Sequence, residues 1–142
     1  MGVFCRMRTP SMGWNLSLPM ILLVLLPESL GGTAPISDDV KAQLPGIEFV
    51  RLAGDDAMKT SAEIANFCVS EGMSPNEMAV ASGSTYYDAV TGAAFCGSKN
   101  SVLLLLVLDG DRTAITDFVA PRKSAIERGY IFGGTASVSE NL

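Results

Sequence analysis

A ten-residue segment occurs twice in the chain, and this repetition constrains the fold more than any other feature. Residues 31–40 read GGTAPISDDV and residues 133–142 read GGTASVSENL, at a constant offset and without a gap. Five of the ten positions are identical and four others are close substitutions. Repetition of this length predicts one structural repeat preceded by the tail of another. We therefore divide the chain into residues 1–30 outside the repeat, 31–46 as the tail, and 47–142 as one nearly complete repeat.

The composition restricts the classes of function that the chain can have. At 142 residues, 48% of them hydrophobic, the chain can form one domain with a real core. The formal net charge is −5 and the ten Lys and Arg residues are scattered, which argues against nucleic acid as a partner. The chain has no histidine, the side chain used most often as a general base and as a metal ligand. We expect no catalytic residues, no metal site and no cofactor, and hence a protein that is not an enzyme.

The spacing of the three cysteines matches neither a disulfide framework nor a zinc site. Cys5, Cys68 and Cys96 are far apart and lack the spacing of a zinc site. Cys68 and Cys96 each lie in an apolar helical pattern, where buried free thiols are common. A disulfide between these two residues in an oxidising compartment is the alternative.

The first thirty residues have two interpretations. A basic start with Arg6 and Arg8 precedes an apolar run over 16–26, as in a secretory signal peptide, and the run is too short for a stable transmembrane helix. Cleavage after the small residues 32–34 would, however, cut inside the repeated segment. The triplet at 28–30 is also a poor strand, whereas its counterpart at 130–132 is a good one. The alternative is therefore a truncated or unrelated start.

Helical and strand-like patterns alternate along the rest of the chain. Apolar runs predict strands at 47–52, 78–81, 101–108 and 130–132. Amphipathic or capped segments predict helices at 37–44, 57–69, 89–96 and 112–128, the last broken at Pro121, and the start of another at 139–142. This alternation predicts an α/β fold with a small, mostly parallel sheet flanked by helices. Helix 37–44 is expected to pack where the helix after residue 139 would lie, closing the module by permutation in the same or a neighbouring chain.

Three motifs in this order resemble the cell wall-binding repeat 2 family. They are RLAGDDAMKT at 51–60, ASGSTYYDA at 81–89 and the two GGTA segments, so the resemblance covers roughly residues 31–142. The family usually has Arg-Tyr where this chain has Ala57-Met58. The resemblance implies a flavodoxin- or Toprim-like module, usually one of three packed with pseudo-threefold symmetry. It also implies a secreted protein held on a Gram-positive cell wall by non-covalent binding of anionic wall glycopolymer, with companion repeats in the same chain or in a homo-trimer.

Five residues are candidates for polymer binding, each with a structural alternative: Arg51, Thr60, Ser82, Gly83 and Asp88. Arg51 lies near the carboxyl end of a strand, where ligands of open α/β sheets bind, and could pair with a phosphate or carboxylate. The Thr60 hydroxyl could face the same edge, or could simply be a polar group at a helix start. Ser82-Gly83 could offer backbone N–H groups to an anion or could form a tight turn. Asp88 is most simply a helix N-cap.

The alternative for Arg51 is a structural link to a nearby aspartate, for which Asp55, Asp56 and Asp88 are candidates. Tyr86 and Tyr87 could stack on sugar rings or cover the edge of the sheet. The segment 109–111 resembles part of a calcium loop, but the later ligands of such a loop are absent, which favours a turn or a helix cap. The two glycine turns lack the spacing of a nucleotide-binding loop and are better explained as tight strand-to-helix turns.

The sequence thus predicts a non-catalytic surface module that binds anionic wall polymer. Because the net charge repels such a polymer, binding would need a local basic patch or a bridging metal ion. Two alternatives stay open at this stage. One is a flavodoxin-like cofactor-binding enzyme domain, which the fold permits but does not establish. The other is a truncated structural remnant of a larger surface protein.

Overall fold

The computed structural model describes residues 28–43 and 49–138. The apolar run at 16–26 and the start of a helix at 139–142 lie outside the described residues, as do the ends of the predicted helix 37–44 and strand 47–52. No helix in the described ranges combines the length and apolar character needed to cross a membrane.

In the described part of the chain, two parallel sheets form in place of the single sheet expected from the sequence. In chain order the elements are β1 (Glu28–Leu30), α2 (Asp38–Ala42), β2 (Val50–Leu52), α3 (Ala57–Ser70), β3 (Glu77–Ser82), α4 (Tyr87–Lys99), β4 (Val102–Leu106), α5 (Thr113–Val119), the 3-10 turn η1 (Ala120–Arg122) and β5 (Arg128–Phe132). The larger sheet has the order β4-β3-β5, and β1 pairs with β2 in a separate two-stranded sheet. Every strand pair is parallel, so the predicted α/β class with a mostly parallel sheet is confirmed.

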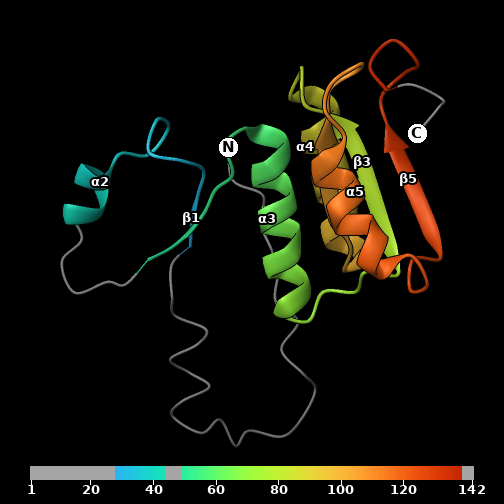
Figure 1. Ribbon diagram of the computed structural model, residues 1–142, viewed down its shortest axis with the longest axis horizontal. Helices are drawn as coiled ribbons and strands as arrows, with labels where there is room; N and C mark the ends of the chain where they lie inside the picture. The colour runs from blue at the N-terminus through green and yellow to red at the C-terminus, as the bar shows by residue number, and fades with distance from the viewer. Residues whose placement is uncertain (1–27, 44–48, 139–142) are drawn as a thin grey trace, which may run out of the picture.

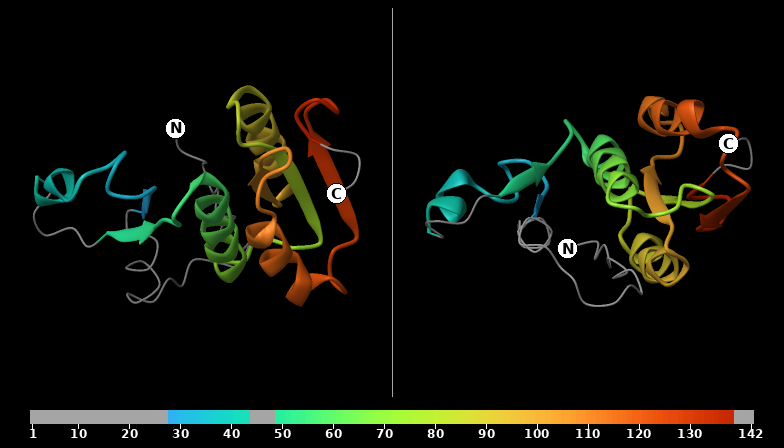
Figure 2. Two further views of the ribbon diagram at one scale, coloured as in Figure 1. Left: turned by 45° about the horizontal axis from the view of Figure 1, so that its top comes forward. Right: turned by 90° about the horizontal axis from the view of Figure 1, so that it is seen from below.

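The core lies between the three-stranded sheet and its helices (Figures 1 and 2). Helix α4 contacts all three strands, α3 lies along β4, and α5 packs on both α3 and β4. Buried side chains from β3, β4, α3 and α5 meet there, with Leu104 and Phe118 almost completely inaccessible. Strands β3 and β4 are covered on both sides, which explains their continuous apolar sequences.

Local chemistry fixes where the helices begin and end. The Asp56 side chain accepts a hydrogen bond from the Lys59 amide at 2.7 Å and so caps α3. On the same helix, the Ser61 hydroxyl accepts a hydrogen bond from the Leu105 amide at 2.9 Å. This bond gives a partner to a backbone N–H group of the edge strand β4. The predicted break at Pro121 is confirmed, because α5 ends at Val119 and a 3-10 turn follows.

Four further expectations from the sequence were wrong. The triplet Glu28–Leu30 is a strand, because pairing with β2 overrides its weak β propensity. Asp88 is not the N-cap of α4, because Tyr86 takes that position and the helix starts at Tyr87, two residues earlier than predicted. Helix α2 does not close the module by permutation, since it projects with β1 and β2 away from the three-stranded sheet (Figure 1). The predicted helix 112–128 also ends early, so that residues from Arg128 onward are free to join the sheet as β5.

The two cysteines in the described ranges are buried free thiols, which makes a prediction about their reactivity. Cys68 and Cys96 are 4% and 3% exposed. Burial raises the pKa of the Cys96 thiol, against the opposing effect of a hydrogen bond with Ser101, so the reactive thiolate is scarce near neutral pH. In a Cys5→Ser variant we expect almost no labelling by a thiol reagent at pH 7.5 in buffer, and two thiols labelled per chain in urea. Rapid labelling of either thiol in buffer would contradict this arrangement.

Candidate functional site

The carboxyl end of the three-stranded sheet carries an exposed pair of tyrosine side chains. Strand β3 ends at Ser82 and leads through the exposed residues Ser84–Tyr86 into α4, whose first residue, Tyr87, is also exposed. Tyr86 and Tyr87 are 59% and 66% exposed, and their ring centroids lie 4.3 Å apart. A side-chain hydrogen bond with Tyr87 raises the pKa of Tyr86. Two aromatic rings held together in solvent offer an apolar platform with hydroxyl groups at its rim.

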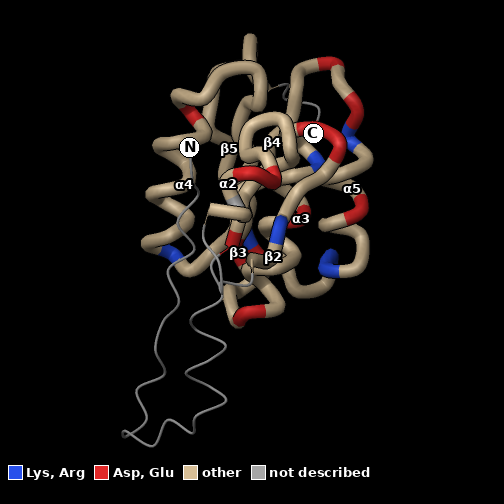
Figure 3. The backbone as a smooth tube through the Cα atoms, turned by 90° about the vertical axis from the view of Figure 1, so that its left-hand side faces the viewer, with Lys and Arg blue, Asp and Glu red and all other residues tan. Residues whose placement is uncertain are grey.

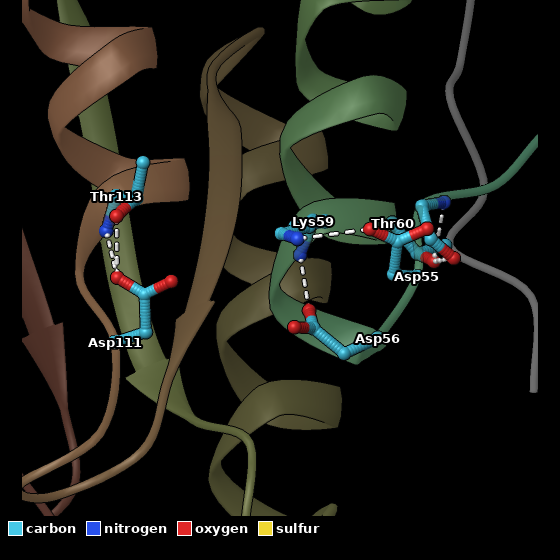
Figure 4. A network of polar contacts seen from close by, with 7 residues as sticks. Asp55, Asp56, Lys59, Thr60, Asp111 and Thr113 are labelled. Carbon is cyan, nitrogen blue, oxygen red and sulfur yellow. Dashed lines mark hydrogen bonds and ion pairs between the residues drawn. The ribbon is translucent and has the colours of Figure 1, made fainter.

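A second group of exposed polar side chains lies where α3 begins (Figure 4). The Lys59 ammonium donates to Asp55 at 2.9 Å, and this bond together with the charge attraction lowers the pKa of Asp55 and raises that of Lys59. Asp111 also acts on Lys59 through its charge, and its own pKa is lowered chiefly by hydrogen bonds from the Thr113 hydroxyl and amide. The segment 109–111 is thus a turn that leads into α5. With one cation among several carboxylates, this group is no basic patch.

Three of the predicted polymer-binding residues are engaged in holding the loops. The Thr60 hydroxyl accepts a hydrogen bond from the Gly54 amide at 2.9 Å. The Gly83 amide donates to the Leu106 carbonyl at 2.6 Å, and the Ser82 hydroxyl accepts from the Ser84 amide at 3.2 Å. These amides are directed at partners inside the protein, so the arrangement supports the tight-turn interpretation over an anion-binding loop.

Arg51 makes a structural link, but to partners that the sequence did not suggest. Its Nη1 donates to the carbonyls of Gly31 at 2.7 Å and Gly32 at 2.9 Å. Its Nη2 donates to the Ile36 carbonyl at 2.9 Å and to Asp38 at 3.2 Å. The expected partners were aspartates at 55, 56 and 88, and the actual ones belong almost entirely to the backbone of the glycine turn. The side chain is only 17% exposed, which leaves little of it accessible to a polymer.

The five predicted residues therefore do not converge on one site. Ser82, Gly83 and Asp88 lie at the carboxyl end of the three-stranded sheet, with Thr60 at the start of α3, whereas Arg51 lies in the two-stranded sheet. Basic residues are scattered over the described part of the chain, apart from the adjacent Arg122 and Lys123 (Figure 3). The group around Lys59 was absent from the sequence prediction, although the four-residue spacing of Lys59 from Asp55, just before α3, was a usable signal.

Comparison with known proteins assigns the chain to a family. The profile of cell wall binding domain 2 (CWB2) matches residues 51–142, which is more than half of the chain. The chain belongs to the CWB2 family. It is accordingly a cell-wall-binding surface module, in a family whose members occur as repeats and are usually non-catalytic.

One solved structure is similar in fold. Cwp8 from Clostridium difficile superposes with a TM-score of 0.66 at 20% sequence identity, over 89% of this chain and 22% of that chain. The chain thus spans about a fifth of the length of that protein, and the likeness concerns the fold alone. Among curated proteins, none matches the chain.

Proposed function

We propose that this CWB2 module anchors a protein to the cell wall by binding anionic wall glycopolymer non-covalently, with the Tyr86–Tyr87 pair as its principal contact. Membership of the family supports wall binding as such. The exposed tyrosine pair is the single observation that supports this contact surface, because two adjacent rings can stack on the apolar faces of sugar residues. Such stacking does not depend on the net charge of −5.

The charged groups at the same end of the sheet have a secondary role in this proposal. Lys59 is a cation that a polymer phosphate or carboxylate could engage, but Asp55 competes for it at 2.9 Å. Thr60, Ser82 and Gly83 shape the edge through their internal hydrogen bonds, with no direct contact to the polymer. The charge contribution is therefore small, and retention on wall should fall only moderately as salt is raised.

A pair of alanine substitutions tests this contact. We expect the Tyr86→Ala/Tyr87→Ala variant to bind purified Gram-positive cell wall at least tenfold more weakly than the unaltered chain in a sedimentation assay. The reason is that losing two stacked rings removes on the order of 1.4 kcal/mol or more of binding free energy. Val90→Ala, at an exposed apolar position on the same helix, serves as the matched control and should bind normally.

The assay separates the contact surface from the function. Wall binding that survives in the double variant would reject the tyrosine pair while leaving the anchoring function in place. Absence of binding by the unaltered chain at every salt concentration would reject the function for this chain. Flavin or nucleotide absorbance in the purified protein would instead favour the flavodoxin-like enzyme alternative.

A further inference from the structure

The segment β1–α2–β2 shows how a glycine turn of this family is followed by the next strand. The chain leaves β1 at Gly31, passes through α2 and returns as β2, parallel to β1 with Ser29 opposite Arg51 and Leu30 opposite Leu52. The Gly31 amide extends this ladder by donating to the Leu52 carbonyl at 2.9 Å. One edge of β1 and the turn that follows it are thus both occupied by β2.

Arg51 is the side chain that fastens β2 to this turn. Its guanidinium reaches three backbone carbonyls, those of Gly31, Gly32 and Ile36, at 2.7–2.9 Å. A planar group with several fixed donors suits such a converging set of acceptors, and a lysine could not reproduce the geometry. The backbone carbonyls of the turn therefore form a binding site for the arginine of the strand that follows it.

The second copy of the turn has the same backbone structure. Gly133 takes a left-handed conformation with φ 129°, as Gly31 does with φ 110°, which favours glycine at both positions. The Gly134 carbonyl accepts a bond from the Val138 amide at 2.9 Å, as the Gly32 carbonyl accepts from Ile36 at 3.3 Å. The repeated sequence therefore corresponds to a repeated structure, with a strand leading into the turn each time.

The strand before the second turn has an exposed edge. Within residues 28–43 and 49–138, β5 pairs with β3 on one side and is the last strand of its sheet (Figure 1). Ile131 is 55% exposed, whereas Ser29, its counterpart in β1, is 7% exposed beside β2. A large apolar residue left open on an edge strand is typical of a place where another strand is added.

We propose that the edge of β5 and the Gly133 turn together accept the first strand of another CWB2 repeat. That strand would lie parallel to β5 in the register that β2 has on β1, which places its arginine opposite Ile131. The carbonyls of Gly133, Gly134 and Val138 receive the guanidinium, as those of Gly31, Gly32 and Ile36 receive that of Arg51. The counterpart of Asp38 is residue 140, outside the described residues. This interaction uses the edge of β5 and the Gly133 turn and does not involve the Tyr86 and Tyr87 rings of the proposed polymer contact, although Asp88, next to that pair, lies close to Gly133.

A comparison of β1 with β5 supports the first strand of a repeat as the partner of β5. β1 is an unfavourable partner for β2: burial and the charge of Glu71 raise the pKa of Glu28, and the buried Ser29 hydroxyl has no hydrogen-bond partner within the described residues. β5 presents Tyr130, Ile131 and Phe132 at the equivalent positions. An apolar strand of this kind suits the Phe-Val-Arg-Leu sequence at 49–52 better than β1 does.

A synthetic peptide with the sequence of residues 47–56 tests the proposal on the full chain. We expect this peptide to bind to the chain. The same peptide with Arg51→Met should bind at least tenfold more weakly in calorimetry, because it lacks the guanidinium that donates to the carbonyls of the Gly133 turn. A peptide with Asp56→Asn is the matched control and should bind within twofold of the original. These substitutions leave the chain itself unaltered, so its folding does not affect the comparison.

The position of the bound peptide is tested separately. Hydrogen exchange should slow at Ile131 and Gly133, whose amides face the open edge if β5 continues the alternation of β1. A chain with Ile131→Pro should bind the peptide at least tenfold more weakly than the unaltered chain, because proline lacks the backbone N–H donor. A chain with Ile131→Thr keeps this donor and should bind the peptide about as tightly as the unaltered chain. Equal binding of the original and Arg51→Met peptides, no binding at all, or protection at Gly31 in place of Gly133 would each overturn the proposal.

Discussion

Replacing Phe118 with alanine is expected to lower the free energy of unfolding by about 3–5 kcal/mol. Phe118 is 1% exposed and is the largest fully buried side chain in the described ranges. It fills the space between α5, α3 and β4, and its loss would leave a cavity that rigid helices and strands could not close. The Arg122 guanidinium lies 4.1 Å from the centre of its ring and would lose this cation–π contact as well.

Urea denaturation followed by circular dichroism measures this effect. Phe118→Leu keeps most of the apolar volume and should cost less than the alanine variant. Val90→Ala, at an exposed position of α4, should change the free energy of unfolding by no more than about 0.5 kcal/mol. A Phe118→Ala chain with unchanged stability would mean that α5 does not pack on the sheet as described.

Replacing Gly54 with alanine is expected to lower the free energy of unfolding by about 1–3 kcal/mol. A Cβ atom at this position would lie 2.4 Å from the Cβ of Lys59 and 2.8 Å from the Thr60 amide nitrogen. These atoms belong to the first turn of α3 or lie next to its backbone, so they cannot move aside without displacing the helix. The Gly54 amide also donates to the Thr60 hydroxyl, and the displacement would strain that bond.

Gly97→Ala is the matched control because the substitution is the same and only the surroundings differ. Gly97 lies within α4, and a Cβ there would meet no atom within 4 Å. This variant should be more stable by roughly 0.5–1 kcal/mol, since alanine loses less conformational freedom in a helix than glycine does. Urea midpoints that shift in the same direction for both variants would contradict the close approach at Gly54.

Much of the fold could be predicted because it depends on local patterns. The apolar run around Leu104 indicated a buried strand, the amphipathic pattern over 57–69 indicated a helix, and Pro121 indicated a break in the helix predicted at 112–128. These features act within a few residues of one another, so the sequence carries them directly. The candidate site was predicted less well, because hydrogen-bond partners are chosen by position in space. The internal hydrogen bonds of Thr60 and Ser82, for example, could not be deduced from residue type.

The sequence by itself determined the alternation of strands and helices, the parallel α/β class and the presence of a repeated turn. Only the tertiary structure decided that β2 pairs with β1 outside the three-stranded sheet, and that Arg51 binds the carbonyls of the preceding turn. The physical reason is that strand pairing and backbone acceptors leave no signature in residue type. Backbone carbonyls are the same at every residue, and the triplet Glu28–Leu30 becomes a strand only because a partner strand with open hydrogen-bonding groups lies beside it.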